Sequence, residues 1–134
     1  MTNTAAIIGG GVIGGGWAAR FLLNGWDVRV FDPDPDAQRK IGEVLDNARR
    51  SLPGLYEAPL PAEGTLSFHE AISDCVQGAD WIQESVPERL ELKQKVYQTL
   101  QEHCDPKAVI GSSTSGFKPS ELQSCATRPD QIMV

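Results

Sequence analysis

A glycine-rich turn near the N-terminus constrains the fold of this chain more than any other stretch. The apolar residues 5–8 lead into Gly9, Gly11 and Gly14, which have the spacing G-x-G-x-x-G. In that pattern the first glycine makes a tight turn, the second admits a pyrophosphate to the backbone, and the third lets a helix pack closely on a strand. Such spacing also arises by chance in glycine-rich chains, so a flexible loop is the alternative interpretation.

The residues after the turn meet the other requirements of a dinucleotide-binding unit. An apolar face through Ala18 and Leu22 predicts a helix that ends at Gly25. A second strand is predicted over residues 27–31 and ends at Asp32. In dinucleotide-binding folds a carboxylate about 20 residues past the turn binds the adenosine ribose. The context therefore favours a nucleotide site over a flexible loop.

Asp32 also indicates which cofactor is bound. Its carboxylate can accept hydrogen bonds from both ribose hydroxyls, but it would repel a 2′-phosphate. Residues 33–36 read Pro-Asp-Pro-Asp and supply no arginine to offset that repulsion. We therefore expect NAD rather than NADP, although Asp32 could simply begin a turn. The expected cofactor contacts here are Gly9, Gly10, Gly11, Val12, Ile13, Gly14 and Asp32.

Strand and helix patterns alternate along the remainder of the chain. Residues 52–64 are rich in Pro and Gly and are expected to form a loop. The alternation predicts an α/β fold, a Rossmann-type doubly wound parallel sheet with helices on both faces. Because the sixth strand is truncated by the end of the sequence, residues 1–134 are expected to be the N-terminal domain of a longer protein. The later strands are predicted over 65–68, 81–86, 108–111 and 132–134, and the later helices near Pro35 (capped by Asp34), Ala71, Leu92 and Pro119.

Composition narrows the range of partners. The formal net charge of −6 argues against nonspecific binding to nucleic acid and favours a small-molecule partner. No apolar run approaches the ~20 residues of a membrane helix, so we expect a cytoplasmic protein without a membrane partner. Cys75, Cys104 and Cys125 are widely spaced, so neither a disulfide framework nor a metal site is expected, and most of these thiols should be buried.

Polar residues follow several of the predicted strands. Ligands of doubly wound sheets bind at the carboxyl ends of the strands, so segments 84–88 and 112–116 should face the same crevice as Asp32. The hydroxyls of the Ser-Ser-Thr-Ser-Gly segment could bind a substrate hydroxyl or a nicotinamide, or they could only form a turn. Glu88 and Lys93 could frame the cofactor, or they could be an exposed charged pair at the start of a helix.

The histidines and tryptophans have simpler interpretations. His69 precedes a predicted helix, and His103 ends one away from the expected crevice, so neither is predicted to be a general base. Trp17, Trp26 and Trp81 occupy positions that pack, so a place in the core or an interface is expected.

Taken together, these motifs resemble the L-3-hydroxyacyl-CoA dehydrogenase superfamily. Within it the chain looks most like the bacterial L-carnitine dehydrogenases, and next like the group of L-gulonate 3-dehydrogenase and lambda-crystallin. The resemblance implies NAD-dependent oxidation of a secondary alcohol at a 3-position to a ketone. It rests on residues 9–16, on Asp32, on Gln83-Glu84-Ser85-Val86-Pro87-Glu88 with Leu92-Lys93, and on Ser112-Ser113-Thr114-Ser115-Gly116-Phe117 with Pro119-Ser120-Glu121.

The resemblance also implies roles for particular residues. Glu88 and Lys93 match the cofactor-contacting pair of the family, and Ser115 matches the serine that contacts the substrate hydroxyl. The acyl-CoA enzymes have Asn where this chain has Ser113, whereas carnitine-type members have Ser. The family's catalytic histidine lies beyond the strand that begins at Ile132, so this chain alone is expected to bind NAD without turnover. The full-length dehydrogenase, with a C-terminal helical domain that is absent here, is expected to be a homodimer.

Charge distribution favours one substrate over another. Acyl-CoA members of the family resemble one another in placing lysines near the second helix and the excursion after it, beside the phosphates of CoA. Residues 51–88 contain seven acidic residues but neither Lys nor Arg, so an anionic CoA would find little compensation there. L-Carnitine, which has a quaternary ammonium group, is therefore the favoured substrate. A 3-hydroxyacyl-CoA substrate, L-gulonate and a non-catalytic NAD-binding module stay open as alternatives.

Overall fold

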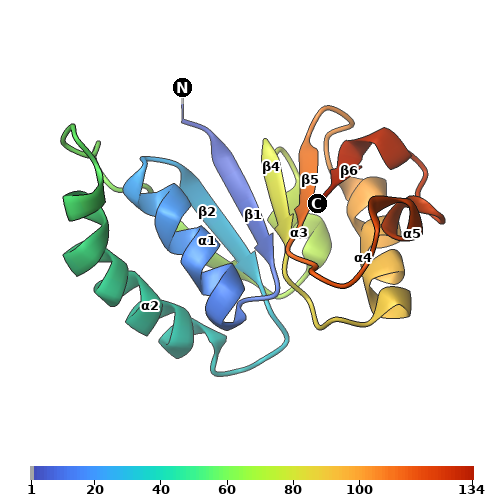
Figure 1. Cartoon of the computed structure of the whole chain (residues 1–134), viewed down its shortest axis with the longest axis horizontal. Coiled ribbons are helices and arrows are strands. Elements are labelled where there is room, and N and C mark those ends of the chain that lie inside the picture. The colour runs from blue at the N-terminus through green and yellow to red at the C-terminus, as the bar shows by residue number, and fades with distance from the viewer. Residues whose placement is uncertain (1) are drawn as a thin grey trace.

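Six parallel strands form a sheet in the order β3-β2-β1-β4-β5-β6, and the computed structural model describes residues 2–134 (Figure 1). Strand order reverses between β1 and β4, so the carboxyl ends of these two strands border the switch point of the sheet. The predicted Rossmann-type fold is confirmed. The strands are β1 (Thr4–Ile8), β2 (Asp27–Phe31), β3 (Leu66–His69), β4 (Trp81–Glu84), β5 (Val109–Ser112) and β6 (Ile132–Met133).

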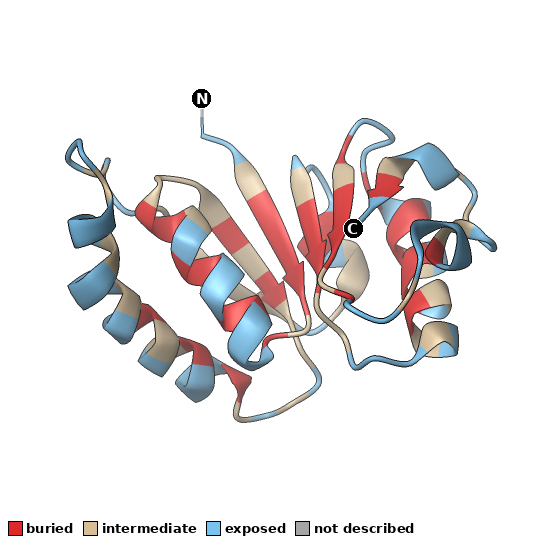
Figure 2. Ribbon diagram, in the orientation of Figure 1, coloured by how far each residue is buried: buried red, intermediate tan, exposed pale blue. Residues whose placement is uncertain are grey.

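Helices cover both faces of the sheet (Figure 1). Ala5 and Ile7 of β1 pack with α1 and α2 on one face, while Ala6 and Ile8 pack with α3 and α4 on the other. Because β1 is buried on both sides, it is apolar throughout its last four residues rather than alternating (Figure 2). The helices are α1 (Gly11–Leu23), α2 (Ala37–Ser51), α3 (Ile72–Val76), α4 (Leu90–His103) and α5 (Pro119–Gln123), with short 3-10 turns η1 (Leu52–Leu55) and η2 (Pro129–Gln131).

Several predicted boundaries are wrong by one residue and two are wrong by two residues, and at both of these a side chain accepts a hydrogen bond from a nearby backbone amide. The second helix begins at Ala37 instead of Pro35, because Asp34 Oδ1 accepts a hydrogen bond of 2.9 Å from the Asp36 amide and holds these residues in a turn. The fourth strand ends at Glu84, because the Val86 amide donates at 2.9 Å to the Glu84 carboxylate. In each case the backbone amide pairs with a local side chain and not with a carbonyl of the helix or sheet.

The cysteines were expected to be mostly buried, and the tryptophans were expected to pack. Cys75 and Cys104 are buried, whereas Cys125 is exposed. Trp26 packs against Phe21 with ring centroids 4.9 Å apart. Within residues 2–134, none of the helices has the length and apolar character required to span a bilayer. The same residues contain no group of three or more His, Cys, Asp or Glu side chains that could hold a metal ion.

Candidate cofactor crevice

The connection between β1 and α1 forms a glycine turn, residues 9–14, at the carboxyl edge of the sheet. A Cβ on Gly14 would lie 2.0 Å from the Gly9 carbonyl oxygen, so only glycine lets α1 approach β1 this closely. Gly11 has a φ of +44°, and a Cβ there would meet no protein atom within 4 Å. The Gly11 position therefore borders open space that a ligand phosphate can occupy.

The first turn of α1 favours an anion in that space. No acidic residue lies in this turn, and no side chain caps the helix at Gly10. Backbone N–H groups at a helix N-terminus are unpaired within the helix, and they carry the positive end of the helix dipole. The glycine turn thus has both the space and the charge required for a pyrophosphate.

Asp32 follows β2 and joins the glycine turn to the adjacent loop. One carboxylate oxygen accepts a hydrogen bond from the Gly10 amide, and the other accepts one of 2.8 Å from the Asp34 amide. Asp32 therefore does form a turn, as the alternative interpretation held. Each oxygen has a second lone pair, so the turn leaves acceptor capacity for ribose hydroxyls. The ribose role remains a prediction.

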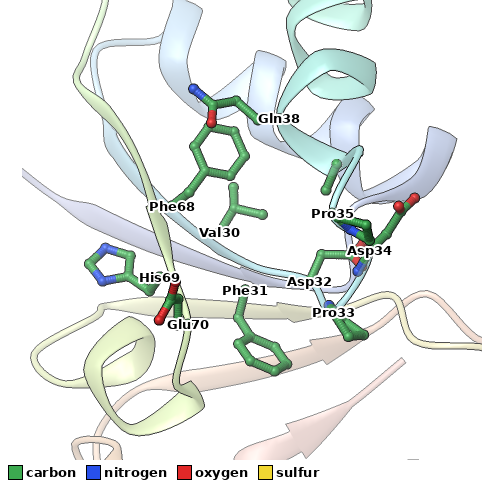
Figure 3. Close-up of a pocket in the computed structure, with 11 residues that line it drawn as sticks. Val30, Phe31, Asp32, Pro33, Asp34, Pro35, Gln38, Phe68, His69 and Glu70 are labelled. Atoms are coloured by element: carbon green, nitrogen blue, oxygen red, sulfur yellow. The ribbon is translucent and has the colours of Figure 1, made fainter.

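A cavity of about 480 Å³ adjoins Asp32 (Figure 3). Its lining includes Val30 and Phe68 from β2 and β3, and also His69 and Glu70. His69 reaches this lining because β3 ends at the same edge of the sheet as β2. The His69 Nε2 atom lies 2.9 Å from the Ser67 hydroxyl, on the side of the sheet order opposite to β4 and β5.

Lys93 is 1% exposed, so the interpretation as an exposed charged pair is wrong for this residue. Its ammonium donates to Glu84 Oε2 at 2.6 Å and to the Val86 carbonyl at 3.1 Å. Glu88 Oε1 is farther away, at 3.5 Å. The principal partner of Lys93 is therefore Glu84, a residue to which the sequence analysis gave no role of its own.

Glu84 is fully buried and accepts hydrogen bonds from four groups. Besides Lys93 and the Val86 amide, the donors are the hydroxyls of Ser112, at 2.6 Å, and Tyr97. Burial raises the pKa of the Tyr97 hydroxyl, and its hydrogen bond to Glu84 raises the pKa further. A carboxylate at the end of a buried strand was the available signal, because such a group requires buried donors.

Glu88 holds the hydroxyl loop, residues 112–116, in place. Its carboxylate accepts hydrogen bonds from the Thr114 hydroxyl at 2.7 Å and from the amides of Ser115 and Gly116 at 3.0 and 3.1 Å. These bonds, led by the one from Thr114, lower the pKa of Glu88 to about 2. Glu88 is therefore ionised at neutral pH, and it acts on the loop that presents Ser115.

The crevice brings most of the predicted site residues together. A cavity of about 440 Å³ is lined by residues 10–14 of the glycine turn and by Glu88, Lys93 and Ser115. Gly9 and Asp32 line an adjoining cavity of about 560 Å³, which also borders Gly10 and Gly11. The two cavities meet at the glycine turn, so an extended ligand with two ends can lie across it. This arrangement fits a dinucleotide.

Comparisons with known proteins agree with this geometry. The chain is 77% identical over 132 residues to an L-carnitine dehydrogenase/betainyl-CoA thioesterase of Ruegeria pomeroyi. The matched region covers 98% of this chain and 27% of that protein. It is 51% identical to an L-carnitine dehydrogenase of Mesorhizobium japonicum, over 100% of this chain and 37% of that protein. The chain thus spans less than half the length of these relatives.

A solved structure shows the same fold. The crystal structure of 5-formyl-3-hydroxy-2-methylpyridine 4-carboxylic acid 5-dehydrogenase, described as an NAD⁺-dependent dismutase, superposes with a TM-score of 0.86 at 34% identity. The match covers 98% of this chain and 43% of the other. Residues 4–134 also match the family described as 3-hydroxyacyl-CoA dehydrogenase, NAD binding domain. With that match over nearly its whole length, the chain belongs to this family as an NAD-binding domain.

Proposed function

We propose that this chain is the NAD-binding part of an L-carnitine dehydrogenase, which oxidises the 3-hydroxyl group of L-carnitine to a ketone. The observation that carries the proposal is the crevice that continues from Asp32 across the glycine turn to Ser115. The similarity of the chain to L-carnitine dehydrogenases, at 77% and 51% identity, supports the choice of substrate. We propose that the complete protein is a homodimer. Analytical sedimentation of the complete protein tests this proposal.

Each part of the crevice has a role in this proposal. The glycine turn would bind the pyrophosphate, and Asp32 would bind the adenosine ribose. NAD supplies the acceptor for the hydride that leaves the alcohol carbon. Ser115 would contact the substrate hydroxyl from the loop that Glu88 holds. Over the described residues, neither histidine lines the cavity that contains Ser115, so the proposal assigns the general base to another part of the protein.

The charges near α2 support a substrate that lacks phosphates. Three of the four basic residues on α2 form ion pairs with carboxylates, which lowers the charge available to an acyl-CoA. A trimethylammonium group carries a positive charge itself and requires no cation from the protein. The ion pairs are Arg39 with Asp36 and Glu43, Lys40 with Asp34, and Arg49 with Asp46 and Glu63.

The cofactor assignment can be tested with this chain alone. Isothermal titration calorimetry should show binding of NAD⁺ in preference to NADP⁺. Asp32→Ala should weaken NAD⁺ binding by about 1 to 3 kcal/mol, because a charged acceptor of two ribose hydroxyls is lost. Glu43→Ala, which removes an exposed carboxylate on α2, is the control and should leave the affinity unchanged. Equal affinity of the Asp32 variant and the unaltered chain would remove the ribose assignment.

The substrate assignment requires the protein that carries this chain. NADH formation should be faster with L-carnitine than with L-3-hydroxybutyryl-CoA or L-gulonate. In that protein Ser115→Ala should reduce kcat with L-carnitine by more than it raises the Kd for NAD⁺, because the hydroxyl contacts the substrate. A preference for the CoA ester would overturn the argument from charge. Loss of NAD⁺ affinity without loss of kcat would assign the hydroxyl loop to turn formation only.

A further inference from the structure

A chain of hydrogen bonds leads from the first residue of β4 to the crevice. Trp81 Nε1 donates to Gln83 Oε1 at 2.9 Å, and Gln83 Nε2 donates to the Ser113 hydroxyl at 2.8 Å. The Ser113 hydroxyl lies 2.8 Å from that of Ser85. Ser85 and Ser113 both line the cavity that contains Ser115. We call these four residues the Trp81 relay.

The chemistry of its first member gives the relay a direction. An indole N–H can only donate, so it must face the oxygen of the Gln83 amide, and the amide nitrogen must then face Ser113. With one lone pair engaged by Gln83, the Ser113 hydroxyl retains one hydrogen and one further lone pair. The Ser85 hydroxyl pairs with either the hydrogen or the lone pair, and the one that it does not use is available to a ligand.

The surroundings of Gln83 leave room for this arrangement and little else. The Gln83 side chain is 3% exposed. A Cβ on Gly111 of the neighbouring strand would lie 2.8 Å from Trp81 Cζ2 and 3.1 Å from Gln83 Oε1. Gly111 therefore provides the space in which the indole and the amide meet. A buried amide with both of its ends paired has a single orientation.

Within the crevice Ser113 lines only the cavity that contains Ser115, whereas Ser85 lines this cavity and also the one that contains Asp32. Asp32 follows β2, on one side of β1, whereas Ser85 and Ser113 follow β4 and β5 on the other side. If Asp32 binds the adenosine ribose, as proposed above, the nicotinamide end of NAD falls beside these serines. We propose that Gln83, oriented by Trp81, is a positioning residue that holds the Ser113 and Ser85 hydroxyls for the nicotinamide end of the cofactor. This inference rests on the proposed function.

Binding of NAD⁺ and of ADP-ribose to this chain tests the inference, because ADP-ribose lacks the nicotinamide. Gln83→Leu and Ser113→Ala should each raise the Kd for NAD⁺ by about fivefold, the effect of one neutral hydrogen bond, and leave the Kd for ADP-ribose unchanged. The double variant should be no weaker than Ser113→Ala alone, because Gln83 acts through Ser113. Trp81→Phe should weaken NAD⁺ binding in the unaltered chain but not in the Gln83→Leu background.

Two further variants separate positioning from folding. Gln83→Glu retains the shape and still accepts from Trp81, but the introduced carboxyl cannot donate to Ser113 when it is ionised. NAD⁺ binding should therefore weaken as the pH rises through the pKa of this carboxyl, whereas ADP-ribose binding should not change. Gln101→Leu is the matched control, because Gln101 is a buried glutamine that bonds to the Arg128 carbonyl and the Thr127 amide. Gln101→Leu should change the Kd of neither NAD⁺ nor ADP-ribose.

The outcomes distinguish this inference from the proposed function. Equal weakening of NAD⁺ and ADP-ribose by the Gln83 variants would overturn the positioning role and indicate a structural one. Additive effects of the Gln83 and Ser113 changes would overturn it as well. If the unaltered chain binds neither ligand, the proposed function fails and the inference fails with it. If both ligands bind the unaltered chain and no relay variant changes either Kd, only the inference fails.

Discussion

Replacement of Lys93 by Met should be among the most destabilising single changes in this chain. The substitution retains most of the side-chain volume but removes the ammonium that lies 2.6 Å from the buried Glu84 carboxylate. Both side chains are almost fully buried, at 2% and 0% exposure. Removal of one partner of a buried ion pair costs about 3 to 5 kcal/mol, because the other charge is left without compensation.

The remaining contacts of Glu84 indicate which end of that range applies. After the change, the carboxylate still accepts from the Val86 amide and from the hydroxyls of Tyr97 and Ser112. These neutral donors stabilise part of the charge, so we expect a loss of about 3 kcal/mol. The unfolding entropy of a chain of 134 residues is about 0.28 kcal/mol/K. The melting temperature should therefore fall by ~11 °C.

Urea unfolding followed by tryptophan fluorescence measures the loss. Lys40→Met is the matched control, because Lys40 forms an ion pair of 2.7 Å with Asp34 in which both side chains are more than a third exposed. This control should cost far less than Lys93→Met, because solvent screens an exposed ion pair. The double variant with Glu84→Gln and Lys93→Met removes both charges, so it should cost at least ~2 kcal/mol less than the sum of the two single changes.

Two results would refute this reasoning. A loss of less than about 1 kcal/mol for Lys93→Met would mean that the pair behaves as an exposed one. Single losses that add within ~0.5 kcal/mol in the double variant would mean that Glu84 and Lys93 do not depend on each other.

Two further predictions concern the glycine turn and Glu88. Gly11→Val should abolish NAD⁺ binding measured by calorimetry, because the valine side chain would fill the open space beside Gly11 that the phosphate requires. Normal affinity of this variant would mean that the cofactor binds elsewhere. Hydrogen bonds from the hydroxyl loop lower the pKa of Glu88 from its ordinary value of 4.5 to about 2, so its stabilising effect is complete above 4.5 and is lost as pH falls toward 2. The difference in unfolding free energy between the unaltered chain and Glu88→Gln should shrink over that window, and a constant difference would contradict the assignment.

The glycine turn and the alternation of strands and helices were predictable because they are local. Backbone conformation at Gly9 to Gly14 depends on a few neighbouring residues, and apolar periodicity reports which face of an element is buried. The errors at Asp34 and Glu84 arose where a side chain binds a backbone amide two residues away. Periodicity does not detect such bonds, because it records hydrophobicity and not hydrogen-bond acceptors.

The crevice was predictable in outline and not in its connections. Residues that follow parallel strands must meet at one edge, so the spacing was enough to group the glycine turn, Asp32 and the hydroxyl loop. The resemblance singled out Glu88, Lys93 and Ser115, and the structure places them in one cavity. The resemblance included Gln83 in one of its motifs but gave it no role, because its amide matters only through Ser113 and Trp81, which lie on either side of it.

The sequence by itself therefore determined the Rossmann-type fold and the neighbourhood of the site, because local spacing and strand order are sufficient for these, and the resemblance of its motifs indicated the family. Tertiary structure decided which polar groups pair. Glu84 lies opposite Ser112 through the register of β4 and β5, and Lys93 reaches Glu84 only because α4 packs on the same face of the sheet. Such pairings join residues distant in the chain, and they exist because a buried charge must find its partners within the folded core.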